Sequence, residues 1–146
     1  MPEQNNQVTE QPVVARDTLP DAEVKDFLSM RNGVRFAGTH LIIDLFDAKH
    51  LNDIDYIEAT LRKCIKAANA TLLNMHLHPF EPDGVSGVAV LAESHISVHT
   101  WPQNNYAAFD VFMCGDTKPE VCIEIMRDAF KPEKISVSEH LRGQGI

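Results

Sequence analysis

The stretch from Ala92 to Thr100 constrains the fold most, because residues of different character alternate along it one by one. Such alternation is typical of a β-strand, whose successive side chains point to opposite faces of a sheet. One predicted face consists of Ser94, Ile96, Val98 and Thr100, and the other of Glu93, His95, Ser97 and His99. A solvated sheet face rich in His and Ser is the plain interpretation. A face with a carboxylate, two imidazoles and a hydroxyl is also equipped for chemistry.

Apolar patterning predicts an α/β (α+β) two-layer sandwich. Residues at three- and four-residue spacing predict helices over 53–68 and 118–130, the first capped by Asn52 or Asp53 and followed by Asn69. Alternating or β-branched runs predict strands. These runs cover 40–46, 71–80, 86–91, 94–100, 106–114 and 135–141. Two amphipathic helices against one mostly antiparallel sheet give two layers, with both main helices on one face.

Length and charge limit the domain organisation and the partners. A chain of 146 residues holds one core, predicted over 21–146 with a short helix at 21–30, after a flexible tail at 1–20. A net charge of −8 argues against nucleic acid as a partner. No apolar run reaches membrane-spanning length, and the start lacks a signal-peptide pattern. Three cysteines give no disulfide framework, so we expect a cytoplasmic protein.

Four motifs point to a known family. The predicted strand continues as Glu-Ser-His-x-Ser-x-His-Thr-Trp-Pro over 93–102, and Ala-Ala-x-Asp-x-Phe-x-Cys-Gly follows over 107–115. Upstream stand Gly-Val-Ser-Gly-Val at 84–88 and Gly-Thr-His at 38–40. Together they resemble the prokaryotic, pyruvoyl-dependent S-adenosylmethionine decarboxylase proenzymes, over roughly residues 36–143.

The resemblance implies that the chain cuts itself between Glu93 and Ser94, giving a β chain 1–93 and an α chain 94–146. Ser94 would become a pyruvoyl cofactor, a step that needs a β-oxygen leaving group and therefore a serine. In the family this carbonyl forms a Schiff base with S-adenosylmethionine and accepts electrons as CO2 departs, the role that pyridoxal phosphate has elsewhere. The product supplies the aminopropyl group for spermidine biosynthesis.

Three more residues match catalytic positions of the family. His99 would assist the processing elimination as a base, Ser86 would hydrogen-bond the cleavage intermediate, and Cys114 would protonate the substrate carbon after CO2 leaves. Each also has a structural interpretation: a surface histidine, a small residue between glycines, and a cysteine that fills the core. Cys64 and Cys122, on the predicted helices, are interpreted as core residues only.

The predicted substrate contacts leave room for alternatives. By resemblance, Phe80 would stack on the adenine and Trp101 would line the same pocket, where a sulfonium would gain cation–π attraction. Gln103 replaces the usual glutamate, which accepts hydrogen bonds from the ribose hydroxyls, and so loses charge-assisted strength. A pyruvoyl-dependent decarboxylase of arginine or ornithine therefore remains an alternative.

A non-enzymatic metal-binding module is a further alternative. Its ligands would be His76, His78, His95 and His99. It leaves the Glu93–Ser94 pair and Cys114 unexplained, so no metal is predicted.

Assembly follows from the predicted layers. Two helices cover one face of the sheet, and a chain of this size has little left to cover the other. The family pairs two cleaved protomers about a two-fold axis, so we expect a homodimer of αβ protomers or a higher assembly. Ser94, His99 and Cys114 are expected from one protomer, with the aromatic pocket completed by the other.

Overall fold

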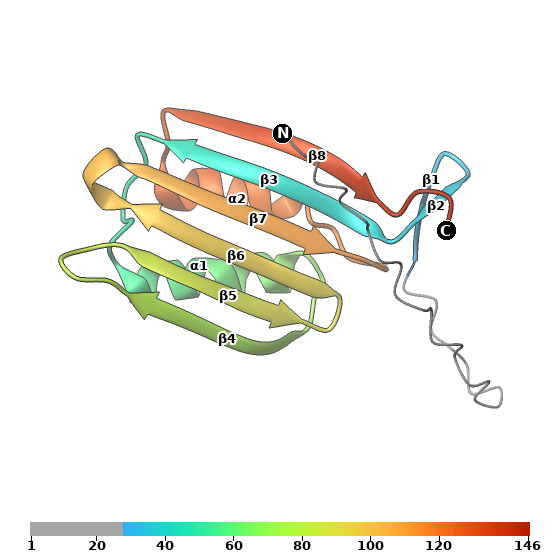
Figure 1. The fold of residues 1–146 in the computed structure, drawn as a ribbon, viewed down its shortest axis with the longest axis horizontal. Helices are drawn as coiled ribbons and strands as arrows, with labels where there is room; N and C mark the ends of the chain where they lie inside the picture. The colour runs from blue at the N-terminus through green and yellow to red at the C-terminus, as the bar shows by residue number, and fades with distance from the viewer. Residues whose placement is uncertain (1–27) are drawn as a thin grey trace, which may run out of the picture.

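Six strands form one antiparallel sheet within residues 28–146, the part of the chain that the computed structural model describes (Figure 1). Their order across the sheet is β4-β5-β6-β7-β3-β8, and every neighbouring pair is antiparallel. The strands are β3 (Gly38–Phe46), β4 (Leu72–Pro79), β5 (Val85–Leu91), β6 (Ser94–Trp101), β7 (Tyr106–Met113) and β8 (Lys134–Arg142). A 3-10 turn, η1 (Pro102–Asn104), connects β6 to β7. The predicted sandwich is confirmed.

Both predicted helices are present, α1 (Ile54–Ala67) and α2 (Val121–Phe130). Asp53 caps α1 by accepting a hydrogen bond from the Tyr56 N–H, at 3.1 Å. Asn69 takes the left-handed conformation just past the end of α1, as predicted. Neither helix, nor any other in the described part, is long and apolar enough to cross a bilayer.

Helix α2 begins three residues later than predicted. The segment before it forms tight turns, in which the Val121 N–H bonds the Lys118 carbonyl and the Cys122 N–H bonds the Pro119 carbonyl. These bonds span three residues instead of the four of an α-helix, so the regular helix starts only at Val121.

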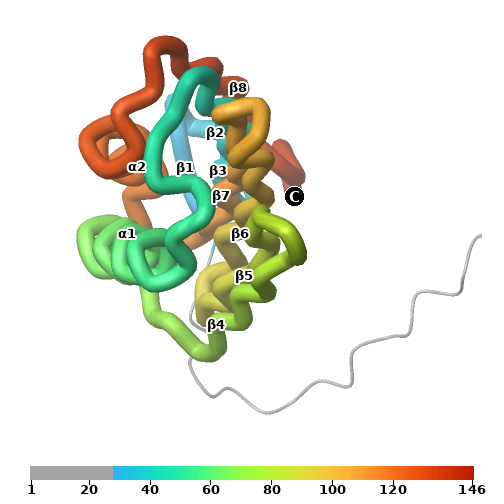
Figure 2. Tube along the Cα trace, turned by 90° about the vertical axis from the view of Figure 1, so that its left-hand side faces the viewer, coloured from blue at the N-terminus to red at the C-terminus, as the bar shows by residue number. Residues whose placement is uncertain are grey.

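The core fills the space between the helices and one sheet face (Figure 2). Its fully buried side chains come from every central strand and both helices. They include Leu41, Ile43, Ile96, Val98, Val111, Leu61, Met126 and Phe130. Truncating such a side chain to alanine typically costs about 2–5 kcal/mol.

The opposite sheet face carries no helix (Figure 2), and we call it the bare face. The strand registers place the pairs His95–Phe112 and Phe112–His40 side by side on it. Several large apolar side chains there are well exposed: Ile42, Val88 and Val90. Exposed apolar groups collected on one face are typical of an interaction surface.

Two local predictions are wrong, and one hairpin was missed. Ser29 and Met30 lie in a strand, not in a helix, because β1 (Ser29–Arg31) and β2 (Val34–Phe36) form a small hairpin. Its turn is the predicted Asn32–Gly33, both at positive φ. The remainder of the predicted helix and the predicted tail at 1–20 lie outside the described residues.

The second correction concerns Leu73, which regular alternation along the predicted strand 71–80 would place on the same face as Met75 and Leu77. The register shifts between Leu72 and Asn74, so an irregularity of the bulge type turns Leu73 outward, where it is 64% exposed. Leu72 packs against the core in its place.

Candidate active site

Ser94 occupies the tightest point of the hairpin between β5 and β6. The strands are joined through Ala92 and Glu93, and the register pairs Leu91 with Ser94. Ser94 has φ of 143°, a region that residues with a side chain rarely adopt. Such a conformation costs about 1–3 kcal/mol and is characteristic of functional sites. The backbone is therefore strained at the residue that follows the predicted scissile bond.

Glu93 is fixed at both its backbone and its side chain. The Cys114 N–H donates to the Glu93 carbonyl at 3.1 Å. The Glu93 carboxylate accepts from the Thr71 N–H, at 3.0 and 3.1 Å to its two oxygens. The carbonyl before Ser94 is thereby held in one orientation and is polarised by a donor.

Cys114 lies just beyond the end of β7, next to Ser94. The register pairs Ser94 with Met113, so the thiol lies half-buried beside the hairpin. Burial and the negative charge of Glu93 raise the pKa of Cys114, while a hydrogen bond with Ser94 partly opposes the shift. The thiol is thus protonated at neutral pH, as a proton donor must be.

Ser86 and His99 form a second cluster, on the bare face. They are direct partners across β5 and β6, and Ser86 Oγ lies 2.8 Å from His99 Nδ1. A hydroxyl that engages one ring nitrogen fixes the orientation of the imidazole and leaves the other nitrogen for a proton transfer.

This cluster forms one wall of a pocket of about 290 Å³. Its lining includes Phe80, Asp83, Ser86, His99, Trp101 and Gln103. Phe80 and Trp101 are 48% and 45% exposed, a high value for aromatic rings and one that leaves them available for stacking. All three predicted substrate-binding residues therefore lie around one pocket with Ser86 and His99.

The Trp101 ring is held in place by stacking on a neighbouring aromatic ring. It stacks on Tyr106 with ring centres 5.3 Å apart and planes at 28°. The Tyr106 hydroxyl donates to Asp44 at 2.6 Å, and this bond, with some burial, raises the pKa of Tyr106 to about 12. A fixed ring offers a preorganised stacking surface.

The loop at 80–84 is also anchored. The Phe80 N–H donates to the Gly84 carbonyl at 2.8 Å, and the Gly84 N–H donates to Asn52 Oδ1 at 2.9 Å. Thr100 Oγ1 accepts from the Val85 N–H at 2.9 Å and donates to the Leu51 carbonyl at 2.7 Å. The bonds to Asn52 and Leu51, the second of them buried, thus tie the pocket to the segment before α1.

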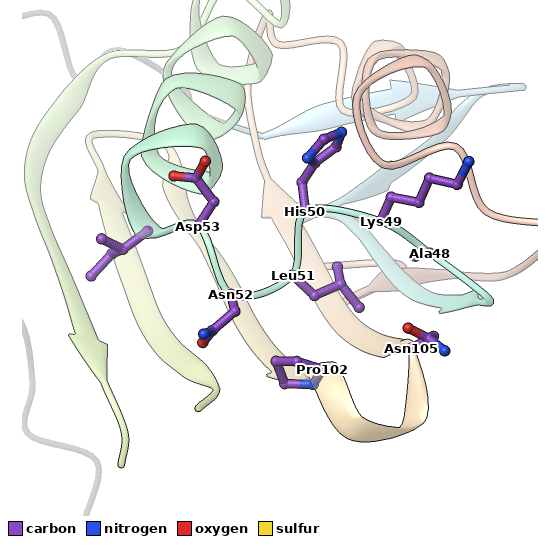
Figure 3. Close-up of a pocket in the computed structure, with 9 residues that line it drawn as sticks. Ala48, Lys49, His50, Leu51, Asn52, Asp53, Pro102 and Asn105 are labelled. Carbon is purple, nitrogen blue, oxygen red and sulfur yellow. The ribbon is translucent and has the colours of Figure 1, made fainter. Parts of the chain in front are cut away.

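A larger hollow of about 730 Å³ lies at that segment, around residues 48–54 (Figure 3). Asn52 and Pro102 are both among the residues that line it (Figure 3). Of the motif residues only Pro102 lines it, and none of the predicted catalytic or substrate-binding residues does. The smaller pocket, with the Ser86–His99 pair and the exposed aromatic rings, is therefore the better candidate for substrate binding.

The two clusters lie at opposite ends of β6. Ser94 begins the strand, and His99 is five residues further along it. At about 3.3 Å per residue, they are roughly 17 Å apart. Within one chain, therefore, His99 does not contact Ser94.

A polar network lies between the clusters, on the bare face. Asp110 accepts hydrogen bonds from His40 at 2.5 Å, from His95 at 3.0 Å and from Ser97. Burial alone would raise the pKa of Asp110, but the bonds from Ser97, His95 and His40 outweigh it and lower the pKa. Sequence reasoning missed Asp110 and His40, although the alternation of their strands indicates which face they occupy.

Within the described residues, the structure does not bring together the four histidines of the metal-binding alternative. His76 and His78 lie on β4. Among the described residues, the one group with suitably close ligand atoms is His40, His95 and Asp110.

The hydrogen bonding of His40 argues against a metal in that group. Arg142 donates to His40 Nδ1 at 3.1 Å, and arginine has no acceptor. Nδ1 therefore accepts, and Nε2 carries the hydrogen that it donates to Asp110. A metal-bound histidine normally donates from its second nitrogen instead. The arrangement favours a hydrogen-bond network.

The fold matches that of a solved enzyme. The crystal structure of the adenosylmethionine decarboxylase from Aquifex aeolicus VF5 superposes with a TM-score of 0.69 at 33% identity, covering 74% of this chain and 92% of that one. The two-layer sandwich described above is thus a fold that a decarboxylase of known structure shares.

Sequence comparisons agree with the structural one. A family model described as S-adenosylmethionine decarboxylase matches residues 39–143. The S-adenosylmethionine decarboxylase proenzyme of Prochlorococcus marinus (strain MIT 9313) is 54% identical over 93 residues, 62% of this chain and 74% of the relative. The proenzyme of Thermomicrobium roseum is 43% identical over 108 residues, 73% and 93% of the two chains. The chain belongs to the S-adenosylmethionine decarboxylase family.

Proposed function

We propose that the chain is a proenzyme that cleaves its own Glu93–Ser94 bond and then releases CO2 from S-adenosylmethionine. The observation that carries the proposal is the strained Ser94, preceded by a carbonyl that the Cys114 N–H holds in place. The product would serve in the cytoplasm as the aminopropyl donor for spermidine biosynthesis. The free thiols of Cys64, Cys114 and Cys122 suit that compartment.

The cleavage uses groups of the chain and one water molecule. The Ser94 hydroxyl attacks the Glu93 carbonyl, and the amide becomes an ester as the Ser94 nitrogen takes up a proton. Removal of the Ser94 α-proton breaks the Cβ–O bond, releases Glu93 as a new carboxyl terminus and leaves a dehydroalanine. Water then displaces ammonia and leaves a pyruvoyl group. The strain at Ser94 favours the first step, because the ester relieves it.

The surroundings of Ser94 fit a pyruvoyl group. When present, the group supplies an electron-accepting carbonyl conjugated with an amide, which stabilises the electrons left by departing CO2. Cys114, beside it, is protonated at neutral pH and donates a proton to the substrate α-carbon. The bonds from Thr71 and Cys114 keep Glu93 in place after the cut.

The site is completed across a two-fold dimer. His99 is too far from Ser94 to remove its α-proton within one chain. We therefore revise the expectation that one protomer supplies both Ser94 and His99, and we infer that the His99 of the other protomer acts on Ser94. A partner that packs its bare face against this one brings its own His99 and Ser86 to the Ser94 end. Sheets that pack face to face lie about 10 Å apart, a gap that side chains from both faces fill.

The proposed arrangement also defines where the two-fold axis would lie. Ser97 is near the midpoint between Ser94 and His99 on β6, and it pairs with Asp110. An axis through this point places the Ser94 end of each protomer opposite the His99 end of the other. The Asp110 network, whose carboxylate already accepts three hydrogen bonds, then lies at the centre of the interface beside the exposed Ile42 and Val88.

Intact mass and CO2 release test the proposal together. Purified protein should contain two fragments split between Glu93 and Ser94, the smaller with a blocked amino terminus. It should release CO2 from S-adenosylmethionine and not from arginine or ornithine. A single uncut chain, or CO2 release from a free diamino acid alone, would contradict the proposal.

A further inference from the structure

Asp83 and Gln103 face each other at the mouth of the aromatic pocket. Gln103 Nε2 donates a hydrogen bond to Asp83 Oδ1. Gln103 belongs to η1 and Asp83 to the loop between β4 and β5, so the bond joins two separate segments around one cavity. Among the described residues that line this pocket, Asp83 alone carries a carboxylate.

The hydrogen bond dictates which atoms remain available. Gln103 uses an N–H, so its carbonyl oxygen is left as an acceptor. Asp83 uses one oxygen, so its other oxygen is left as a charged acceptor. The pair therefore presents two acceptors, one of them negative, next to the exposed rings of Phe80 and Trp101.

Two adjacent acceptors match a vicinal diol. Each hydroxyl of a ribose donates one hydrogen bond, and a carboxylate is a common partner for such hydroxyls. A bond to an ionised acceptor is roughly twice as strong as one between neutral groups. Gln103 by itself supplies only a neutral acceptor, which is why its presence in place of glutamate puts nucleoside binding in doubt.

We propose that Asp83 is a specificity-determining residue that binds the ribose hydroxyls of S-adenosylmethionine, with Gln103 orienting its carboxylate. The inference rests on the proposed function and names how that pocket selects a nucleoside. The negative charge needed for the ribose is thus supplied from the loop at 80–84, not from position 103.

The position of Asp83 is built into the fold. Its neighbour Gly84 donates to Asn52, and the loop is closed by the bond between the Phe80 N–H and the Gly84 carbonyl. Gly84 has φ of 108°, and a Cβ there would meet the Thr100 carbonyl oxygen at 3.2 Å. The loop is held in one conformation, so the carboxylate is presented without an ordering cost on binding.

Steady-state kinetics of four proteins test the role. Asp83→Asn keeps size and removes the charge, and we expect KM for S-adenosylmethionine to rise about 10-fold or more, with kcat changed less than about threefold. The double variant Asp83→Asn/Gln103→Glu exchanges the two groups, so that position 103 carries the carboxylate and position 83 the amide that bonds it. KM should then return to within about threefold of the wild-type value. Glu81→Gln, in the same loop but outside the pocket, is the matched control and should leave KM unchanged.

Competition by nucleosides adds a readout that loop structure alone would not move. Adenosine should inhibit the wild-type protein about 10-fold more tightly than 2′-deoxyadenosine or 3′-deoxyadenosine. In Asp83→Asn that preference should disappear, while cleavage at Glu93–Ser94 stays complete and confirms folding.

Two kinds of failure are distinguishable. Suppose first that the wild-type protein decarboxylates S-adenosylmethionine. The role of Asp83 is then wrong if Asp83→Asn keeps the wild-type KM, if the double variant does not recover it, or if the deoxyadenosines compete as well as adenosine. The proposed function stands in each of these cases. If the wild-type protein is cleaved but releases no CO2 from S-adenosylmethionine, the proposed function is wrong and the ribose role falls with it.

Discussion

At the residue scale, the proposed chemistry depends on a few side chains that the motifs single out. Ser94 and Cys114 lie together at one end of β6, whereas Ser86 and His99 form a separate cluster near its other end. The sequence alone did not show that they form two clusters. Ser94 and His99 are only five residues apart, but in an extended strand that spacing separates them by most of the strand's length instead of bringing them into contact. Nor could the sequence show Asp83 beside Gln103, since their bond joins two loops.

Replacing the serine tests the cleavage junction. Ser94→Ala has no hydroxyl to attack the Glu93 carbonyl, so the protein should remain a single chain and release no CO2. Ser136→Ala, an exposed serine on the edge strand β8, is the control and should be cleaved normally. Two fragments from Ser94→Ala would place the junction elsewhere.

Replacing the thiol separates cleavage from turnover. Cys114→Ala should still be cut, because the thiol acts only after CO2 has left. Turnover should fall about 100-fold, the usual contribution of a positioned acid. Mass spectrometry and a CO2 assay on the same sample measure both effects, and full turnover from the cleaved variant would remove Cys114 from the mechanism.

The raised pKa of Cys114 also predicts a pH dependence. A proton donor is active below its pKa and is lost as pH rises through that value. Because burial and Glu93 raise the pKa above its ordinary 9.0, the midpoint at which the protonated thiol is lost should lie above pH 9. The pH profile of kcat shows this limb, and a limb well below pH 9 that Cys114→Ala abolishes would contradict the assignment.

At the element scale, patterns with a local cause were predictable and long-range pairings were not. The Asp53 cap, the Asn69 stop and the alternation of β6 follow from neighbouring residues, and the structure has all three. The irregularity that turns Leu73 outward depends on how β4 pairs with β5, which local sequence does not specify. The same holds for the Asp110 network, whose partner His40 is 70 positions away.

The Asp110 network predicts a pH-dependent contribution to stability. A carboxylate whose pKa is lowered by folding stabilises the protein above its unfolded pKa, and the effect is lost as pH falls through the folded pKa. The free energy of unfolding of the wild-type protein should exceed that of Asp110→Asn by about 1–3 kcal/mol at neutral pH.

The difference should stay constant down to about pH 4 and shrink below the ordinary pKa of 3.8. Chemical denaturation of both proteins across this range measures it. Asp116→Asn, an exposed carboxylate beyond β7, should show no such difference. A gap that widens toward acid pH would contradict the account of Asp110.

At the scale of the whole molecule, the Ser94 and His99 clusters lie too far apart to meet within one chain. The proposed two-fold partner would account both for this separation and for the apolar groups on the bare face. Sedimentation should therefore show a dimer or larger assembly at micromolar concentration. A fully active species with the mass of one 16.3 kDa protomer would contradict this.

Co-expression of two defective chains tests the shared site most directly. Ser94→Ala cannot be cut, and His99→Ala should be cut slowly or not at all when expressed alone. In a mixed dimer, the Ser94 of the His99→Ala chain meets the intact His99 of the Ser94→Ala chain. With different tags on the chains, mass spectrometry of the purified mixed dimer should show the His99→Ala chain cleaved between Glu93 and Ser94 and the other intact. A mixed dimer in which both chains stay uncut would contradict the account, as would His99→Ala protein that cleaves by itself at the wild-type rate.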